Sequence, residues 1–147
     1  MKEITRIRRI IATMANRLKK MGLTLSAAFK KAWKLVKGHT IETKIAGVTK
    51  GNRQKALHRI SVKYHSEDVT VNLIRDTANL YDNHAVKINI SVNDSEAYTI
   101  GYIPRNLAYV VSAILDKGIK LTATFKEVRG HYQPYMNYGA VITLKFA

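Results

Sequence analysis

Residues Arg75 to Ile88 read R-D-T-A-N-L-Y-D-N-H-A-V-K-I, and they are the most informative part of the chain. Three short polar side chains surround Tyr81 within it: Asn79, Asp82 and Asn83. Apolar, strand-like runs flank the stretch over 69–74 and 85–92. Asx side chains hydrogen-bond to nearby backbone and so favour turns between strands. The pattern therefore predicts a tight turn that holds an aromatic ring in one geometry, which is how a loop presents a binding site.

A second informative block, I-G-Y-I-P-R, occupies residues 100–105. It predicts a strand ending at Gly101 and Tyr102, followed by a helix over 105–116, because proline suits the first turn of a helix. Gly118 then lies where a helix C-terminus favours glycine. We interpret Tyr102 as a packed residue of the sheet, and Gly101 and Pro104 as residues that set the backbone shape.

Elsewhere after residue 40, apolar residues recur with a period of two, which is typical of strands. The predicted strands cover 41–47, 56–64, 69–75, 85–92, 98–103, 119–128 and 139–146. Many short strands with one helix favour a small β-barrel of the α+β class, similar to OB and SH3-like barrels.

The first 38 residues follow a different pattern, with apolar residues every three or four positions. This spacing predicts two amphipathic helices separated near Gly22 and ending near Gly38. Four lysines lie on or beside the polar face of the second helix: Lys30, Lys31, Lys34 and Lys37. We therefore divide the chain into a basic helical extension over 1–38 and a barrel domain over 39–147.

Positive charge is concentrated at the front of the chain. The net charge is +15, of which residues 1–60 hold +14, from sixteen Lys or Arg against two Glu. Such a field attracts polyanions, and nucleic acid is the commonest of them. We expect the four lysines of the second helix to contact a nucleic-acid backbone. The apolar stripe of the extension would pack against its partner helix or the barrel, or form a homodimer seam. Binding of the basic face to anionic membrane is a weaker alternative.

The two blocks, in this order and spacing, resemble the HIRAN domain, a small β-barrel module found in DNA-repair helicases and as a free-standing protein in bacteria and phages. The resemblance covers 41–147. It implies that Asn79, Tyr81 and Asp82 line a groove for single-stranded DNA, in several members its free 3′ end. Independently, a tyrosine ring can stack on a base, and an aspartate can accept a hydrogen bond from a terminal hydroxyl. The alternative is that Asp82 and Asn83 only brace the turn and Tyr81 only fills the mouth of the barrel.

This chain departs from the end-binding members of the family at one place. Those members carry an aromatic pair after the first strand, where this chain has Thr49, Lys50 and Gly51. Tyr132 and Tyr135, in the late loop over 130–138, are our candidates to replace that stack. We also expect a cluster of cations to contact phosphates: Lys50, Arg53, Lys55, Arg59 and Arg75.

No arrangement of residues predicts catalysis. The chain has no cysteine, and its five histidines lack the spacing of metal ligands. It also lacks a phosphate-binding glycine loop and a nucleophile elbow. We therefore expect no enzyme activity, no metal and no cofactor. We also expect a cytoplasmic protein without a signal peptide or a membrane span.

Together these observations predict a non-catalytic protein that binds single-stranded DNA, with RNA as an alternative ligand and a helicase or nuclease as a further partner. The main rival hypothesis starts from the first 38 residues, which resemble the leader of small proteins from Gram-positive phages and mobile elements. In that case the protein would inhibit a nucleoprotein target, such as a CRISPR nuclease with its guide RNA, and the barrel would serve as a scaffold.

Overall fold

The computed structural model describes Arg9 and residues 40–116, 118, 120–131, 133 and 136–146. Arg9 is helical, and the rest of the predicted helical pair over 1–38 lies outside the described residues.

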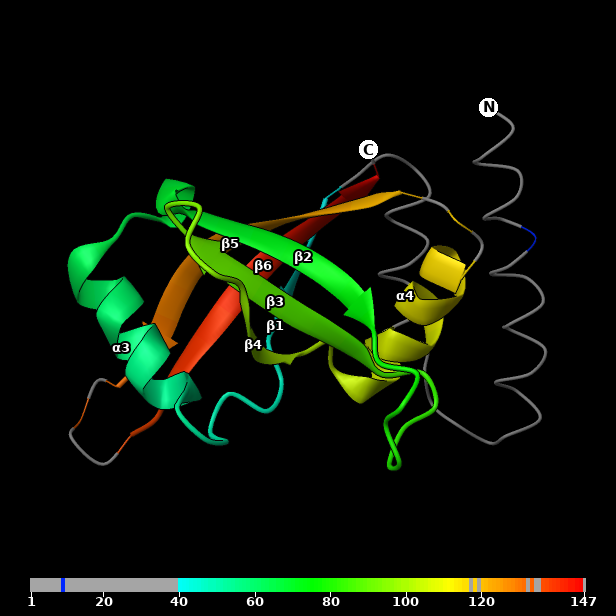
Figure 1. The fold of residues 1–147 in the computed structure, drawn as a ribbon, viewed down its shortest axis with the longest axis horizontal. Coiled ribbons are helices and arrows are strands. Elements are labelled where there is room, and N and C mark those ends of the chain that lie inside the picture. The colour runs from blue at the N-terminus through cyan, green and yellow to red at the C-terminus, as the bar shows by residue number, and fades with distance from the viewer. Residues whose placement is uncertain are drawn as a thin grey trace.

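Six antiparallel strands form one sheet in the order β1-β6-β5-β2-β3-β4. Their bounds are β1 Ile41–Lys44, β2 Val69–Arg75, β3 Val86–Val92, β4 Tyr98–Tyr102, β5 Leu121–Gly130 and β6 Tyr138–Phe146. Helix α3 (Arg53–Lys63) covers one end of the sheet and helix α4 (Arg105–Asp116) lies at the other end, while a short 3-10 turn, η1 (Ser66–Asp68), precedes β2 (Figure 1).

The sheet curves so far that its two edges meet. Directly after β1, Ala46 pairs with Tyr102 at the end of β4 through two backbone hydrogen bonds of 2.8 and 2.9 Å. On the opposite side, β2 and β5 are joined at a single residue pair, Thr70 with Thr124. The sheet is therefore an α+β half-barrel, and the prediction of a small β-barrel is confirmed only in this form.

Gly101 makes this closure possible. A Cβ atom at this position would lie 2.4 Å from the carbonyl oxygen of Ala46 and 2.4 Å from Cγ2 of Ile45. No side chain fits at such distances, so the glycine of the I-G-Y-I-P-R block sets how closely the two edges approach.

The interior of the half-barrel is aliphatic. Strand β3 shows the clearest alternation, with Val86, Ile88, Ile90 and Val92 buried and the residues between them half-exposed. Burying one face of a strand in this way is what a period of two in the sequence predicts.

The prediction of a strand over 56–64 is wrong: residues 56–63 belong to helix α3, and Tyr64 caps its C-terminal end. Ile60, Val62 and Tyr64 alternate as in a strand, but Val62 is 63% exposed. The residues that enter the core are Leu57 and Ile60, which are three positions apart and therefore lie on one face of a helix.

The prediction of a helix over 105–116 is confirmed by α4. The carbonyl of Pro104 accepts the first hydrogen bonds of this helix, from the backbone N–H groups of Leu107 and Ala108. Leu107, Ala108 and Val111 join the hydrophobic core. The helix thus follows directly from the strand that closes the half-barrel.

Candidate nucleic-acid interface

The loop over 76–85, here called the Tyr81 loop, connects β2 to β3 and projects from the body of the molecule (Figure 1). Asn79 organises it: Oδ1 of Asn79 accepts hydrogen bonds from the backbone N–H groups of Tyr81 (2.9 Å) and Asp82 (3.0 Å). Its Nδ2 donates to Oδ2 of Asp76 at 3.3 Å. These bonds form the Asx turn that the sequence predicts.

Further bonds fix the second half of the Tyr81 loop. Oδ1 of Asp82 accepts a hydrogen bond of 2.9 Å from the backbone N–H of His84. The His84 ring packs edge-on against Tyr109 of α4, with ring centroids 4.4 Å apart. Asp82 therefore braces the loop and uses one carboxylate oxygen to do so.

The tip of the Tyr81 loop is almost fully solvent-accessible. Tyr81 is 90% exposed and Leu80 is 94% exposed. Tyr81 therefore does not fill the mouth of the barrel, which was one interpretation of the sequence. Large exposed apolar groups on an ordered loop often mark a contact surface.

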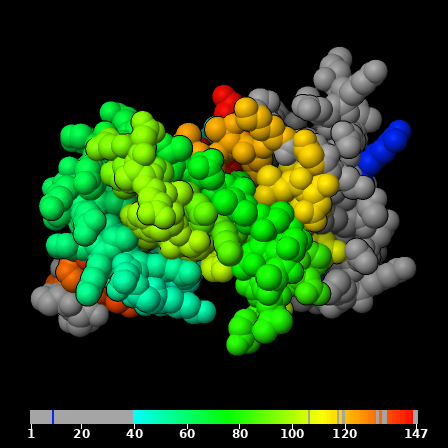
Figure 2. Space-filling model, viewed as in Figure 1, coloured from blue at the N-terminus to red at the C-terminus, as the bar shows by residue number. Residues whose placement is uncertain are grey.

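A hollow of about 290 Å³, here called the loop hollow, lies between the Tyr81 loop and the closure point of the half-barrel. Figure 2 shows the loop as a projecting green lobe, separated by a notch from the blue-green residues near position 50. Polar and aromatic side chains of the loop hollow are Lys50, Asn79, Tyr81, Asp82, Tyr102 and Arg105. The three residues of the predicted groove therefore line one hollow.

Tyr102 is a lining residue that our sequence interpretation placed in the packed interior. It is half-buried, its hydroxyl donates to Oδ2 of Asp76 at 3.1 Å, and the Arg53 guanidinium lies 5.7 Å from its ring centroid. Burial raises the pKa of Tyr102 above its ordinary value, and the hydrogen bond and negative charge of Asp76 add to this effect. The sequence feature that could have indicated this role is the position of Tyr102 directly after Gly101, where the two sheet edges approach closely.

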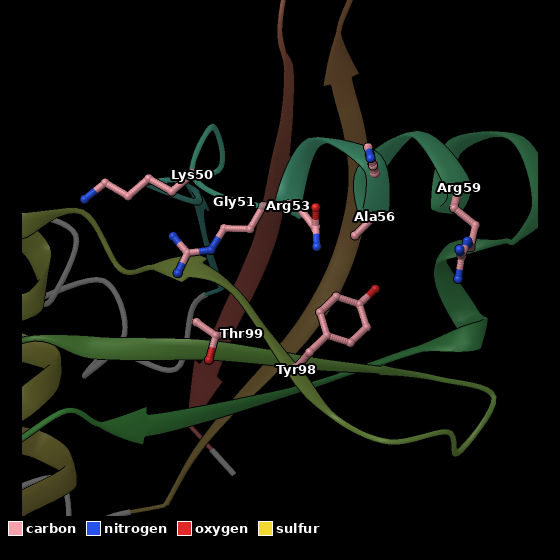
Figure 3. A pocket seen from close by; sticks show the side chains of 9 residues that line it. Lys50, Gly51, Arg53, Ala56, Arg59, Tyr98 and Thr99 are labelled. Atoms are coloured by element: carbon pink, nitrogen blue, oxygen red, sulfur yellow. The ribbon is translucent and has the colours of Figure 1, made fainter.

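A larger hollow of about 560 Å³, here called the helix hollow, lies between α3 and the start of β4. Four predicted phosphate contacts line it: Lys50, Arg53, Lys55 and Arg59. Figure 3 shows Arg53 and Arg59 reaching from α3 to either side of Tyr98, a residue that the sequence analysis did not single out. Burial raises the pKa of Tyr98, an effect that the positive charge of Arg59 partly opposes.

Arg75, the fifth predicted phosphate contact, is engaged within the fold. Its guanidinium donates to the backbone carbonyls of Ala85 (2.7 Å) and Asn83 (3.0 Å) and to Oδ1 of Asp116 (2.9 Å). The side chain is 18% exposed. Arg75 thus ties the base of the Tyr81 loop to the end of α4, and the structure gives it a positioning role.

The remaining candidate residues fall outside the described part of the chain. They are Tyr132, Tyr135, Lys30, Lys31, Lys34 and Lys37. Tyr138, the last residue of the late loop over 130–138, is half-buried against the core. Its backbone N–H donates to Oε1 of Gln54, and its carbonyl accepts a hydrogen bond from Nε2 of the same residue.

Among the described residues, no cluster of three or more His, Asp or Glu side chains is arranged to hold a metal ion. Within the same part of the chain, no helix is long and apolar enough to span a membrane.

The fold and the site define a small half-barrel module with two joined basic hollows, of the kind that binds nucleic acid. Residues 39–144 match the HIRAN domain, and because this match covers most of the chain, the protein belongs to the HIRAN domain family. Membership of this family indicates binding of nucleic acid, in particular single-stranded DNA.

A crystal structure of a protein from Lactobacillus plantarum is similar to this one with a TM-score of 0.44, at 17% sequence identity over 72% of this chain and 98% of that chain. No curated protein matches the sequence.

Proposed function

We propose that this protein is a non-catalytic module that receives the 3′ end of single-stranded DNA in the loop hollow, while its basic N-terminal region binds the DNA backbone. The observation that carries this proposal is the combination, in one hollow, of an exposed Tyr81 and the carboxylate of Asp82. A base stacks on an aromatic ring whatever its identity, so the site is independent of sequence.

Asp82 supplies the preference for an end. Its Oδ1 accepts a hydrogen bond from the backbone N–H of His84. Its Oδ2 would then accept a hydrogen bond from a 3′ hydroxyl. A phosphate at that position, either terminal or continuing the strand, would be repelled by the carboxylate. Lys50 and Arg105 line the same hollow and would contact the phosphates on the preceding side.

The experiment compares oligonucleotides that carry a 3′ hydroxyl with the same oligonucleotides blocked by a 3′ phosphate, using fluorescence anisotropy. Tyr81→Ala should weaken binding by about 1–3 kcal/mol, the contribution of one base–aromatic stack. Asp82→Asn keeps an acceptor oxygen for the N–H of His84 but loses the charge, so it should accept the blocked end as well as the free one.

Controls separate these effects from changes in the fold. Tyr81→Phe keeps the ring and should bind like the wild type, and Asp94→Asn removes an exposed carboxylate from the β3–β4 turn without touching the hollow. We expect a modest end preference in the wild type, because the aromatic pair of end-binding relatives is missing. Equal affinity of wild type, Tyr81→Ala and Asp82→Asn for both kinds of end would reject the proposal and favour the inhibitor hypothesis.

A further inference from the structure

The helix hollow and the loop hollow are neighbours that share one side chain. Lys50 lines both of them, and Arg53, which lines the helix hollow, lies over the ring of Tyr102 in the loop hollow. A strand that ends beside Asp82 can therefore continue past Lys50 towards α3.

An aromatic side chain, Tyr98, lines the helix hollow. It is 38% exposed, and Figure 3 shows its ring directed from β4 towards Ala56 of α3, with Arg53 and Arg59 on either side. Arg53, Ala56 and Arg59 are spaced three residues apart and so lie along one face of the helix. Ala56, which has a small side chain, lines the helix hollow together with Tyr98.

The pairing of β4 is irregular directly after Tyr98 and Thr99. Gly101 pairs with Ile88 and Thr99 pairs with Asn89, so Ile100 is an extra residue in β4. Such a bulge changes the direction of the side chains beside it. Here Tyr98 and Thr99, which are adjacent in sequence, both line the helix hollow, and Thr99 is held by a hydrogen bond of 2.7 Å from its Oγ1 to Oδ1 of Asn89.

The two hollows differ in charge, so one suits the end of a DNA strand and the other an internal segment. The loop hollow contains the carboxylate of Asp82. Among the described residues, those that line the helix hollow include four cations and no acid. A site without a carboxylate suits the continuous phosphates of an internal segment, and its volume of about 560 Å³ is within the range of small-ligand pockets.

We propose that the helix hollow is a second nucleotide-binding subsite, in which a base of single-stranded DNA stacks on Tyr98 and the flanking phosphates contact Arg53 and Arg59. This inference rests on the proposed function, because it extends the path of the same strand. It makes Tyr98 and Arg59 determinants of how many nucleotides the protein binds.

The test measures affinity against oligonucleotide length, using thymidine oligonucleotides of about 2 to about 10 nucleotides with a free 3′ hydroxyl, a span that includes the smaller site sizes of such barrels. Wild-type affinity should rise with length until the helix hollow is occupied. Tyr98→Ala should bind the shortest oligonucleotides like the wild type and the longer ones about 5- to 150-fold more weakly. Tyr98→Phe keeps the ring and should retain the full length dependence.

Arg59→Gln and Lys63→Gln form a matched pair on α3, because both residues are exposed cations and only Arg59 lines the helix hollow. Arg59→Gln should weaken binding of the longer oligonucleotides and reduce the slope of log K against log salt by about 0.7, while Lys63→Gln should change neither. If Tyr98→Ala does not fold, as judged by thermal melting, this pair decides the outcome.

The inference is overturned if folded Tyr98→Ala and Arg59→Gln keep wild-type affinity at every length, or lose affinity equally at every length. Binding of the shortest oligonucleotides depends on the loop hollow alone. If the wild type does not bind them, that result counts against the proposed function and not against the second subsite.

Discussion

The hydroxyl of Tyr102 donates a hydrogen bond of 3.1 Å to Oδ2 of Asp76, which joins the last residue of β4 to the first residue of the Tyr81 loop. The same oxygen accepts a hydrogen bond from Nδ2 of Asn79 at 3.3 Å. Because the backbone of Tyr102 also pairs with Ala46, one residue connects the closure of the half-barrel to the loop that carries Tyr81. The position of the loop thus depends on the pairing at the sheet edge.

This bond predicts an alkaline titration. The folded protein raises the pKa of Tyr102 above 10.0, first by burial and then through Asp76, so the contribution of this group to stability is intact below about pH 10 and is lost as the pH rises through the folded pKa. Asp76→Asn removes the negative charge, so the pKa of Tyr102 should fall towards its ordinary value. NMR titration of ring-labelled tyrosine measures this, with Tyr102→Phe to assign the signal, and an unchanged titration in Asp76→Asn would contradict it.

Gly101→Ala should destabilise the protein strongly, because its Cβ would lie 2.4 Å from the carbonyl oxygen of Ala46. The clash is with backbone, so relief requires the two sheet edges to separate, and we expect a loss of about 1–3 kcal/mol or more in the free energy of unfolding. Gly139→Ala is the matched control, since a Cβ there meets its nearest atom at an ordinary 3.9 Å. Chemical denaturation measures both, and equal stability of the two variants would show that the edges are not tightly constrained.

The sequence predicts the parts of this fold whose pattern is local. The Asx turn around Tyr81 and the helix after Pro104 are both set by residues within a few positions of each other, and both are found where the sequence places them. Helix α3 was missed because Ile60, Val62 and Tyr64 alternate like a strand, and only the burial of Leu57 against distant strands shows which period applies.

The candidate site was predictable in part for the same reason. Lys50, Arg53, Lys55 and Arg59 are near one another in sequence, and the structure brings them to one hollow. Tyr98 lines this helix hollow and Tyr102 lines the neighbouring loop hollow. Both tyrosines are placed there by long-range pairing, of β4 with β3 and of Ala46 with Tyr102. The hydrogen bond from Arg75 to Asp116, 41 residues away, could not be predicted because it also depends on long-range packing.

Asn79→Ala should release the Tyr81 loop. Two backbone N–H groups lose their acceptor, and because each hydrogen bond contributes about 0.5–1.5 kcal/mol net, the loop should lose about 1–3 kcal/mol of local stability. Hydrogen exchange at the amides of Tyr81 and Asp82 measures this, and affinity for single strands should fall with it. Asn83→Ala is the control, because Arg75 donates to the backbone carbonyl of Asn83 and alanine keeps that carbonyl. Protected amides in Asn79→Ala would show that other contacts hold the loop.

We expect the salt dependence of DNA affinity to depend on the lysines of the N-terminal region more than on other surface lysines. Replacing Lys30, Lys31, Lys34 and Lys37 with Gln removes four of the charges in residues 1–60. If these lysines bind the DNA backbone, the slope of log K against log salt should become shallower by about 0.7 for each phosphate that is no longer neutralised, or roughly 2.8 in all. The matched control replaces four exposed lysines of the half-barrel that line neither hollow: Lys44, Lys63, Lys120 and Lys145. Both variants lose the same net charge, so a purely global attraction would weaken them equally, and only direct binding of phosphates by the N-terminal lysines would reduce the slope more in the N-terminal variant.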